Sequence, residues 1–373
     1  MPSKSEVKQA VENLGRFSIK EEIDEGANAF AFRASDLLLQ RDVFLKVIYY
    51  SPERASDLLR EPRVLVSATE CTPKPENLVQ VFGADVIAVA DEQYLCLHME
   101  WIEGSSLLST LANDIGQLDA VRITRGVLHG LAHLHSRRIL HRDLKPANIL
   151  LDGQTPKIAD FGSVAVLPAG MTTVPASRHS ALYVPPEGWG TSPYYSVASD
   201  IYQAGMLLYE LVNGPFEYRL RHYLTPKVLR ELRREKLDYD SLDDCDQSQL
   251  ADKGIAQLSS EGRLLLRGRA PRPYFSARLR RIVNGATKPK PSKRYASAAE
   301  FLAKLNQVDL PNWRSLGDSG FLAENWRGWD WTVCQGATNV LVRKAQPGTN
   351  NFRRIPNRAF ASFADGFSYV EEQ

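Results

Sequence analysis

The feature that most constrains this chain is a pair of short polar motifs, both within residues 139–162. The first reads His-Arg-Asp-Leu-Lys-Pro-Ala-Asn and begins at His141, and the second reads Asp-Phe-Gly and begins at Asp160. Asp-Gly at residues 152–153 predicts a hairpin between them, which places the first motif on a loop and Asp160 after the second strand. Carboxylate and amide oxygens beside a lysine are groups that bind magnesium and a phosphate chain.

These two motifs resemble the catalytic loop and the Asp-Phe-Gly element of eukaryotic-like protein kinases. Lys145, two residues after Asp143, is similar to the form of the loop found in serine/threonine kinases. The resemblance implies an α+β, bilobal protein kinase fold, with a small β-rich N-lobe and a large helical C-lobe. It also implies a serine/threonine protein kinase that transfers the γ-phosphoryl group of ATP to protein hydroxyls, with ATP and Mg²⁺ as cofactors.

The resemblance assigns catalytic roles residue by residue. Asp143 would accept the proton of the substrate hydroxyl, and Lys145 would neutralise charge on the moving phosphoryl group. Asn148 and Asp160 would hold magnesium on the phosphate chain. Such a transfer depends on positioning and electrostatics more than on covalent help.

A lysine in an apolar strand gives the next expectation. Val43–Ile48 reads as a buried strand that carries Lys46, and a buried lysine is costly unless it is paired. The resemblance makes Lys46 the residue that holds the α- and β-phosphates. Residues 52–68 read as a helix on which Glu61 would be the ion-pair partner of Lys46, and Pro62 indicates a late helix start or a kink. The alternative interpretation of Glu61 is a solvated helix charge.

A glycine-poor segment precedes that strand. Residues 23–34 look like a kinase phosphate-covering loop between two strands, and Ile23, Gly26 and Ala31 are its expected ATP-binding positions. Glycines at such a loop let backbone amides approach phosphates closely. The family's middle glycine alone is present here, as Gly26.

The adenine would bind at a hinge between the lobes. The resemblance makes Met99 the gatekeeper, and backbone groups of Glu100 and Ile102 would bond the adenine edge. Leu150 is a further expected ATP-binding residue. Phe44 departs from the family pattern, because a small residue usually stands there against the adenine ring. A phenyl group at this position would crowd the nucleotide pocket.

Residues 163–180 read as a flexible activation segment that contains serine and threonine. The resemblance suggests that Arg142 meets a phosphate on this segment and orders it through charge-assisted hydrogen bonds. Ordinary loop hydroxyls are the alternative. The candidate phosphorylation sites are Thr172, Thr173, Ser177 and Ser180.

Three further residues are expected to have structural roles. Residues 183–187 look like the end of an activation segment, and Glu187 would pair with Arg294. Asp200 begins an almost wholly apolar helix over residues 199–211, where a single carboxylate needs hydrogen-bond donors. In the family this residue bonds the backbone of the catalytic loop, so Asp200 would be part of the scaffold.

The patterns predict five regions along the chain. Residues 1–17 form an N-terminal tail or helix, 18–100 the N-lobe and 101–308 the C-lobe. Within the C-lobe, residues 215–275 depart from a minimal kinase and read as an insertion. This insertion is either exposed to solvent without a further role or close to the place where substrates dock. Residues 309–373 form an accessory module beyond the resemblance.

The accessory module is rich in aromatic residues and is expected to contain β-structure. Residues 331–334 and 339–342 look like the strands of a hairpin. Interleaved arginines would suit stacking on nucleic acid. Packing on the kinase lobe, or recognition of a protein partner, is favoured, because a small module must bury its aromatic side chains. Its tryptophans are Trp313, Trp326, Trp329 and Trp331.

Bulk properties exclude some functions. The net charge of +2 gives no reason to expect binding to nucleic acid or to a membrane surface. The sequence has neither an apolar run long enough to span a membrane nor a signal-peptide core at its start, and its 4 cysteines are far apart. These features favour a cytoplasmic protein with free thiols. His129 and His133 have a metal-like spacing, but a metal is not expected without a third ligand.

Two other functions stay open. The glycine-poor loop and Phe44 would suit a degraded kinase that acts as a binding scaffold. A small-molecule phosphotransferase is the other alternative, although such enzymes generally lack a segment like residues 183–187.

Overall fold

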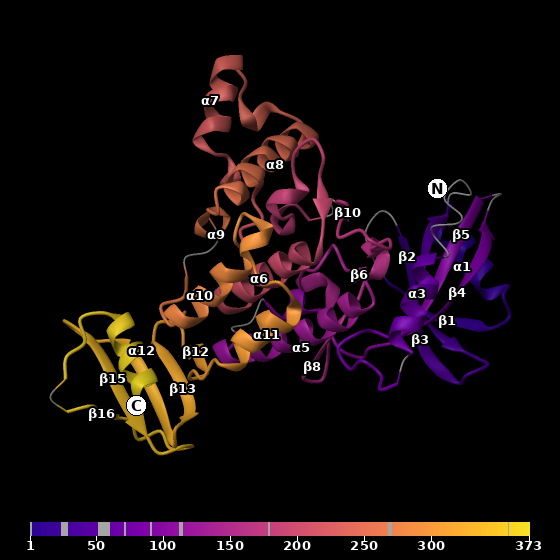
Figure 1. The fold of residues 1–373 in the computed structure, drawn as a ribbon. Coiled ribbons are helices and arrows are strands. Elements are labelled where there is room, and N and C mark those ends of the chain that lie inside the picture. Colours follow the sequence, from indigo (N-terminus) through magenta and orange to yellow (C-terminus); the bar gives the residue numbers. More distant parts are fainter. Residues whose placement is uncertain are drawn as a thin grey trace.

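The chain folds into a β-sheet lobe, a helical lobe and a second β-sheet that carries the C-terminus, from right to left in Figure 1. This architecture confirms the predicted α+β fold with two lobes and a β-containing C-terminal part. The structure is a computed structural model, and it describes residues 2–23, 29–50, 60–70, 72–89, 92–111, 115–177, 180–267, 271–356 and 358–373.

The N-lobe is built on one antiparallel sheet with the strand order β1-β2-β3-β5-β4. Side chains alternate along β3: Val43, Leu45 and Val47 are fully buried on one face, so Lys46 points to the other. The strands are β1 (Phe17–Ile23), β2 (Ala29–Asp36), β3 (Arg41–Tyr50), β4 (Val81–Val89) and β5 (Glu92–Glu100).

Within the described part of the N-lobe, two helices pack on this sheet. Helix α1 (Lys4–Glu12) begins at a capping box headed by Ser3, which satisfies amides at the helix start. Its buried Val7 and Val11 join the hydrophobic cluster on the fully buried face of β3. Helix α3 (Arg60–Thr69) packs beside β4. The N-terminal residues are therefore part of the lobe.

Two predictions for this lobe differ from the structure in their bounds. Residues 77–82 read as a strand in the sequence, but β4 starts four residues later, at Val81, and runs to Val89. Asn77 and Val79 exchange backbone hydrogen bonds with Ile158 instead, at distances of 2.9 Å. The helix predicted over residues 52–68 is described from Arg60 onward, so Pro62 lies in the first turn of α3, where a proline is tolerated.

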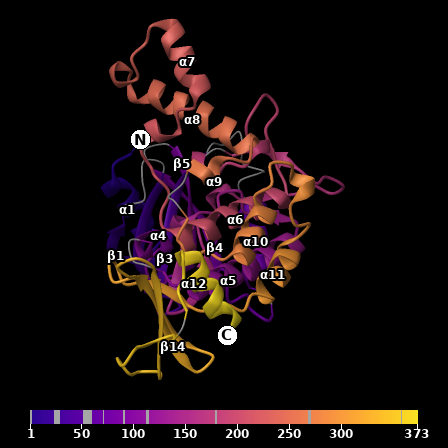
Figure 2. The same ribbon diagram turned by 90° about the vertical axis from the view of Figure 1, so that its left-hand side faces the viewer.

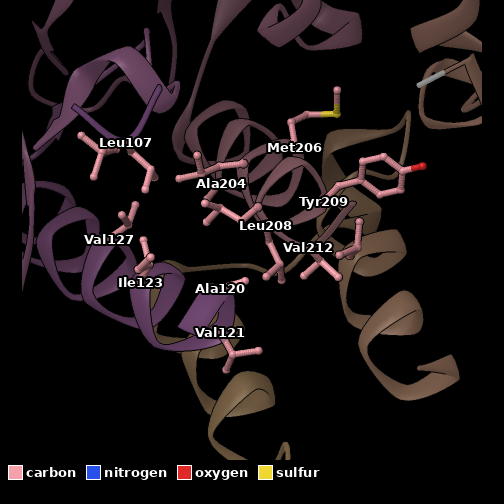
Figure 3. Close-up of a cluster of buried hydrophobic side chains, with 14 of the residues drawn as sticks. Leu107, Ala120, Val121, Ile123, Val127, Ala204, Met206, Leu208, Tyr209 and Val212 are labelled. Atoms are coloured by element: carbon pink, nitrogen blue, oxygen red, sulfur yellow. The ribbon is translucent and has the colours of Figure 1, made fainter. Parts of the chain in front are cut away.

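The C-lobe is organised around α6 (Val197–Asn213), whose residues from Ser199 to Asn213 are all buried. It packs against α5 (Gln117–Ser136), and Figure 3 shows apolar side chains of the two helices in contact. The sequence predicts both helices, since residues 118–136 have apolar positions at helical spacing and residues 199–211 read as an apolar helix. Among the described residues, no helix has the length and apolar character needed to cross a membrane. The other helices are α4 (Leu107–Thr110), α7 (Pro226–Glu235), α8 (Asp244–Ser260), α9 (Leu264–Arg267), α10 (Ala277–Ala286) and α11 (Ala298–Asn306).

The C-lobe also contains short strands and single-turn helices. The hairpin predicted at Asp-Gly is present: β7 (Ile149–Asp152) pairs with β8 (Thr155–Ile158) across a two-residue turn. The other short pairs are β6 (Ile139–Leu140) with β9 (Ala165–Val166) and β10 (Val174–Pro175) with β11 (Tyr194–Tyr195). The 3₁₀ helices are η2 (Pro146–Asn148), η3 (Phe161–Ser163), η4 (Ala181–Tyr183), η5 (Pro186–Gly188), η6 (Leu220–Tyr223), η7 (Tyr239–Ser241) and η8 (Pro291–Lys293).

The C-terminal module is a five-stranded antiparallel sheet in sequence order, with α12 (Phe363–Glu372) packed on β14 and β15. The predicted hairpin is the β14–β15 pair. Figure 2 shows this module and α7 at opposite ends of the molecule. The strands are β12 (Trp313–Ser315), β13 (Phe321–Trp326), β14 (Trp329–Gln335), β15 (Val340–Ala345) and β16 (Arg353–Arg354).

The module shares one hydrophobic core with the C-lobe. Tyr274, between α9 and α10, is fully buried against Phe321 and Phe367 of the module, with ring centroids 5.5 Å and 6.1 Å away. The Asn312 side chain accepts a hydrogen bond of 2.9 Å from the Leu118 amide and so caps α5. The aromatic residues of the tail therefore pack against the C-lobe, as the composition indicated.

Candidate active site

The catalytic loop is held by a buried carboxylate at the start of α6. Asp200 is fully buried and accepts hydrogen bonds from the backbone amides of His141, at 3.0 Å, and Arg142, at 2.9 Å. His135 of α5 lies 2.8 Å from the same carboxylate. Burial by itself would raise the pKa of Asp200, but the contact with His135, the nearby His141 and the Arg142 amide together lower the pKa below its ordinary value. The contact to the loop backbone is the one expected for Asp200.

Gln203, one turn further along α6, braces the same loop. Its side-chain oxygen accepts a hydrogen bond of 3.0 Å from the Leu144 amide. Its side-chain nitrogen donates to the carbonyls of Arg142, at 3.1 Å, and Tyr183, at 3.3 Å. Gln203 therefore ties the catalytic loop to the end of the activation segment. Sequence reasoning missed Gln203 and the role of His135, because a polar residue inside a helix carries no pattern that names its partner.

The predicted catalytic pair lies at the centre of the loop. The Lys145 ammonium is 2.9 Å from a carboxylate oxygen of Asp143 and 2.8 Å from the hydroxyl of Ser180. Asn148 donates to the backbone carbonyl of Asp143 at 2.7 Å and to its carboxylate at 3.1 Å. These bonds fix the Asp143 side chain between a cation and an amide, and they bring the activation segment to the same point.

Asp160 meets Lys46 across the two lobes. Their oxygen and nitrogen are 2.8 Å apart, although the residues are 114 positions apart in sequence. Asp160 has a left-handed backbone with φ of 54°. Its carboxylate accepts a hydrogen bond of 3.2 Å from the backbone amide of Gly162, two residues further along the chain. Burial would raise the pKa of Asp160, but the charge and hydrogen bond of Lys46 lower it below the ordinary value. The side chain of Glu61, the predicted partner of Lys46, lies outside the described part of the structure.

The residues expected to hold magnesium fit that task. Both hydrogen bonds of Asn148 use its nitrogen, which leaves the amide oxygen as the group able to bind a cation. The lowered pKa of Asp160 beside Lys46 favours its negatively charged form. In the described part of the chain, no three His, Cys, Asp or Glu residues are grouped to hold a metal alone. A cation here would complete its shell with phosphate and water oxygens, as Mg²⁺ commonly does.

The expected nucleotide-binding positions line one face of the N-lobe sheet. The register places Ile23 opposite Ala31, and Ala31 opposite Lys46. Gly26 lies outside the described residues. Met99, the expected gatekeeper, is buried and lies opposite Phe44 on β3. The sheet thus brings four predicted positions to the side of the catalytic loop.

The hinge carries two features that the sequence did not indicate. Phe44 stacks on Trp101, with ring centroids 6.5 Å apart and planes at 22°. The Glu100 carboxylate accepts a bond of 2.7 Å from Lys157 of β8, and its amide donates to the Gln80 carbonyl at 2.8 Å. Glu100 therefore links the two lobes through its side chain. Ile102, buried, and Leu150, half-buried on β7, lie on the C-lobe side of this hinge.

The phosphorylation candidates differ in their surroundings. Thr172 and Thr173 are exposed and lie directly before β10. The Ser177 hydroxyl donates a long hydrogen bond of 3.4 Å to the Arg142 carbonyl. Ser180 is held by Lys145, which makes its hydroxyl part of the catalytic centre.

Glu187 and Arg294 form the ion pair that the sequence suggested. Two nitrogens of Arg294 each donate at 2.7 Å to the two carboxylate oxygens, and the Arg294 side chain has no exposed surface. Ser199 of α6 adds a hydrogen bond of 2.7 Å to Glu187. This bidentate pair anchors the end of the activation segment to the C-lobe.

Comparisons with known proteins agree with this geometry. Residues 17–305 match the family model of the protein kinase domain. The chain is 29% identical over 209 residues to serine/threonine-protein kinase PrkC of Bacillus subtilis (strain 168), which covers 54% of the chain and 31% of that protein. It is 32% identical over 172 residues to serine/threonine-protein kinase Nek3 of Mus musculus, which covers 43% of the chain and 33% of that protein. It is 32% identical over 201 residues to mitogen-activated protein kinase kinase 3 of Arabidopsis thaliana, which covers 52% of the chain and 37% of that protein.

The match spans between 31% and 37% of the length of these three relatives. The C-terminal sheet from β12 onward lies beyond the matched residues. Because the family match covers well over half of the sequence and the expected catalytic residues converge between the two lobes, the chain belongs to the protein kinase family.

Proposed function

We propose that this chain is an ATP-dependent serine/threonine protein kinase that phosphorylates protein hydroxyls and its own activation segment. The observation that carries the proposal is the contact network around Asp143: Lys145 at 2.9 Å, and through Lys145 the Ser180 hydroxyl at 2.8 Å. The network joins a base to the segment over which a substrate chain would pass. The curated relatives named as serine/threonine kinases support the choice of substrate hydroxyl.

The side chains would divide the work of the transfer. ATP with Mg²⁺ supplies the phosphoryl group and part of the charge that neutralises it. Asp143 would orient the acceptor hydroxyl and take its proton. Lys145 and Lys46 would stabilise negative charge on the phosphates, while Asn148 and Asp160 would hold the cation. All five are fixed before substrate arrives, which is the arrangement that electrostatic catalysis needs.

Three finer assignments belong to the same proposal. Glu61 would pair with Lys46 when the nucleotide is bound. Thr172 and Thr173 are the first choices for regulatory phosphorylation, as exposed hydroxyls in the segment whose Pro175 carbonyl accepts a hydrogen bond of 3.3 Å from Arg142. A cytoplasmic location agrees with the free thiols of the three described cysteines, and the C-terminal module would recognise a protein partner.

A second candidate function is a nucleotide-binding scaffold without turnover. The stack of Phe44 on Trp101 favours it, because a phenyl ring on the nucleotide-facing side of β3 narrows the space for adenine. A titration with ATP and magnesium, followed by turnover assays, separates the two candidates. Binding without transfer would support the scaffold.

Intact-mass spectrometry of the full chain with ATP and magnesium tests the proposed activity. We expect added phosphates on the parent protein and none on Asp143→Asn, whose side chain is nearly the same size but a far weaker base. An exposed carboxylate far from the cleft provides the matched control, Asp318→Asn, which should behave as the parent. Equal phosphorylation of the parent and Asp143→Asn would contradict the assignment.

A further inference from the structure

A second surface of interest is a cavity on the C-terminal module, with a volume of about 470 Å³. The kinase family match ends at residue 305, so this cavity lies in a part of the chain that the family does not explain. Figure 1 shows β16, the last strand of the module sheet, on the side away from the C-lobe. The lining of the cavity combines an indole, two cations and polar neutral side chains: Trp329, Lys344, Arg353, Gln346, Thr349 and Asn351.

Two pairs of like charges face each other across β15 and β16. The strand register places Lys344 directly opposite Arg353, and Arg343 directly opposite Arg354. Because side chains alternate along a strand, one pair lies on each face of the sheet. Like charges directly opposite on neighbouring strands destabilise a sheet. An anion bound between Lys344 and Arg353, the pair that lines the cavity, would remove this repulsion.

The protein itself supplies no counter-charge to these cations. Residues 343–358 contain five basic residues and neither aspartate nor glutamate. Among the described residues, no carboxylate forms an ion pair with any of the four cations, since the ion pairs of the module involve Arg314 and Arg327. The described lining residues include no carboxylate either. The cavity is therefore suited to an anion from another molecule.

The wall of the cavity is fixed before a ligand binds. Asp330 is 8% exposed, and its carboxylate accepts backbone hydrogen bonds from Asn325, at 2.7 Å, and Gly348, at 2.9 Å. These bonds tie the loop after β15 to β14. Within that loop, the amide and the hydroxyl of Thr349 both donate to the Gln346 carbonyl, at 3.0 Å and 2.8 Å. A site ordered in this way loses less conformational entropy on binding than a flexible one.

Two indole rings position one of the cations. The Lys344 ammonium lies over Trp329, 4.2 Å from the ring centroid, and 5.7 Å from the ring centroid of Trp331. A ring face attracts the charge but does not saturate the three N–H donors of the ammonium, which stay able to bind oxygen atoms. Lys344 also covers a face of Trp329, which disfavours the base stacking that single-stranded nucleic acid needs.

The charge and the donors in the cavity match a phosphorylated side chain. A phosphate on serine or threonine carries a charge of about −1.5 to −2 at pH 7 and has three strong acceptor oxygens. Lys344 and Arg353 supply two positive charges, and the side-chain amides of Gln346 and Asn351 supply neutral donors. A carboxylate, with a single charge, would leave one of the cations without a counter-charge.

The neighbouring strand offers a place for the chain that carries such a group. In the described sheet, β16 pairs only with β15, so its outer edge has no strand beside it. The free edge of a sheet can hydrogen-bond an extended peptide, whose alternate side chains then point to one face. A side chain of a peptide in this position would therefore lie on the same face as Arg353.

We propose that this cavity binds a phosphoserine or phosphothreonine of a protein partner, whose chain lies extended along the outer edge of β16. The opposed cations Lys344 and Arg353 carry the inference, because they repel each other until an anion joins them. It gives a site and a chemical class to the protein recognition proposed for the module. It rests on the proposed function for that recognition alone, since binding requires neither ATP nor phosphate transfer.

Fluorescence anisotropy on the full chain without ATP tests the site. The probes are labelled peptides with one central phosphoserine among alanine and valine residues, and the same peptides with serine or glutamate in its place. At about 150 mM salt, where weak surface charge is screened, we expect phosphoserine to bind about tenfold or more tightly than serine, with glutamate clearly weaker than phosphoserine. A labelled single-stranded DNA oligonucleotide is the rival polyanion and should bind more weakly than the phosphopeptide.

Two variants and one matched control locate the binding. Arg353→Gln and Lys344→Gln each remove one lining cation, so each should weaken phosphopeptide binding about tenfold. Arg354→Gln removes the same charge from the same strand but on the opposite face, and it should change affinity less than about twofold. Arg353→Gln should not lower Tm, because it relieves a like-charge contact, whereas loss of a structural arginine would lower it.

The outcomes separate this inference from the proposed kinase activity. Equal affinity for phosphoserine and serine, or for phosphoserine and glutamate, would overturn the phosphate site, as would equal losses in Arg353→Gln and Arg354→Gln. DNA binding as tight as that of the phosphopeptide, lost in the same variants, would replace the peptide by nucleic acid. Selective phosphopeptide binding by a protein that transfers no phosphate leaves the site standing and overturns the kinase activity. Phosphate transfer without selective binding does the reverse.

Discussion

The catalytic centre and the C-terminal module are stabilised in different ways. Around residues 141–148, buried polar side chains each satisfy several named backbone groups: Asp200 serves two amides and His135, and Gln203 serves one amide and two carbonyls. The module is instead held by rings, with Phe367 packed against Trp313 at 4.8 Å and Phe321 at 5.3 Å.

This difference decides what each region tolerates. A hydrogen bond needs a particular donor and acceptor at a particular distance, so changing one atom of a buried polar group leaves its partners unsatisfied. Aromatic packing needs volume and shape, and similar side chains can exchange at modest cost. We therefore expect even conservative substitutions to destabilise the catalytic centre, whereas the module should tolerate them.

The largest effect on stability is expected from Glu187→Ala. The Arg294 side chain has no exposed surface, so removing its partner leaves a buried charge uncompensated, at about 3–5 kcal/mol of unfolding free energy. Urea denaturation measures the loss. Glu217→Ala is the matched control, because the side chains of its ion pair are exposed, Glu217 to 41% and Arg219 to 87%. This substitution should lower the free energy of unfolding by about 0.5 kcal/mol or less. A loss below about 1 kcal/mol for Glu187→Ala would remove the contrast with the module.

A slightly smaller effect is expected in the module from Phe367→Ala. Deleting a buried ring that packs on both the module and Tyr274 should cost about 3 kcal/mol or more. Phe367→Leu should cost less than about 1.5 kcal/mol, because most of the volume is kept. Since the core is shared with the C-lobe, Phe367→Ala should also lower the C-lobe transition in calorimetry. A separate low-temperature transition for the module alone would contradict the shared core.

Gln203→Ala tests the hydrogen-bonded catalytic centre in the same comparison. It leaves the buried Leu144 amide without an acceptor, for a loss of about 1–3 kcal/mol. It should also slow autophosphorylation at temperatures where the variant is fully folded, because the catalytic loop loses its tie to Tyr183. Gln249→Ala, an exposed glutamine on α8, is the control for both readouts. Unchanged kinetics would restrict Gln203 to a purely structural role.

The smallest effect is expected from Glu371→Gln on α12. Burial, followed by the charge of Glu372, raises the pKa of Glu371 to about 7 from an ordinary value of 4.5. The folded carboxyl therefore holds a proton that the unfolded chain releases near pH 4.5, and the protein loses stability as the pH rises from there toward 7. Glutamine mimics the protonated form, so it should raise Tm by about 1–3 °C at pH 8 and leave it unchanged at pH 4. An equal shift at both pH values would indicate a cause other than this proton.

The active site was largely predictable because its residues sit in contiguous motifs. Residues 141–148 and 160–162 contain the residues that the structure brings together at this site, Asp143, Lys145, Asn148 and Asp160. The pattern also linked Glu187 to Arg294 across 107 positions. His135 and Gln203 were missed, since each is a lone polar residue in an otherwise apolar helix. The strand over residues 77–82 was misplaced because the backbone there pairs with Ile158 of β8, and no local pattern reveals a partner so far away.

By itself, the sequence determined the kinase lobes, the catalytic loop and the presence of an aromatic β-hairpin near the C-terminus, because motifs and strand periodicity are local properties of the chain. The tertiary structure alone decided that the C-terminal sheet shares the core of the C-lobe through Tyr274, and that Phe44 stacks on Trp101 at the hinge. Both results depend on which apolar surfaces meet after folding. Because the hydrophobic effect is non-directional, a local sequence pattern does not specify which distant surface an apolar residue packs against.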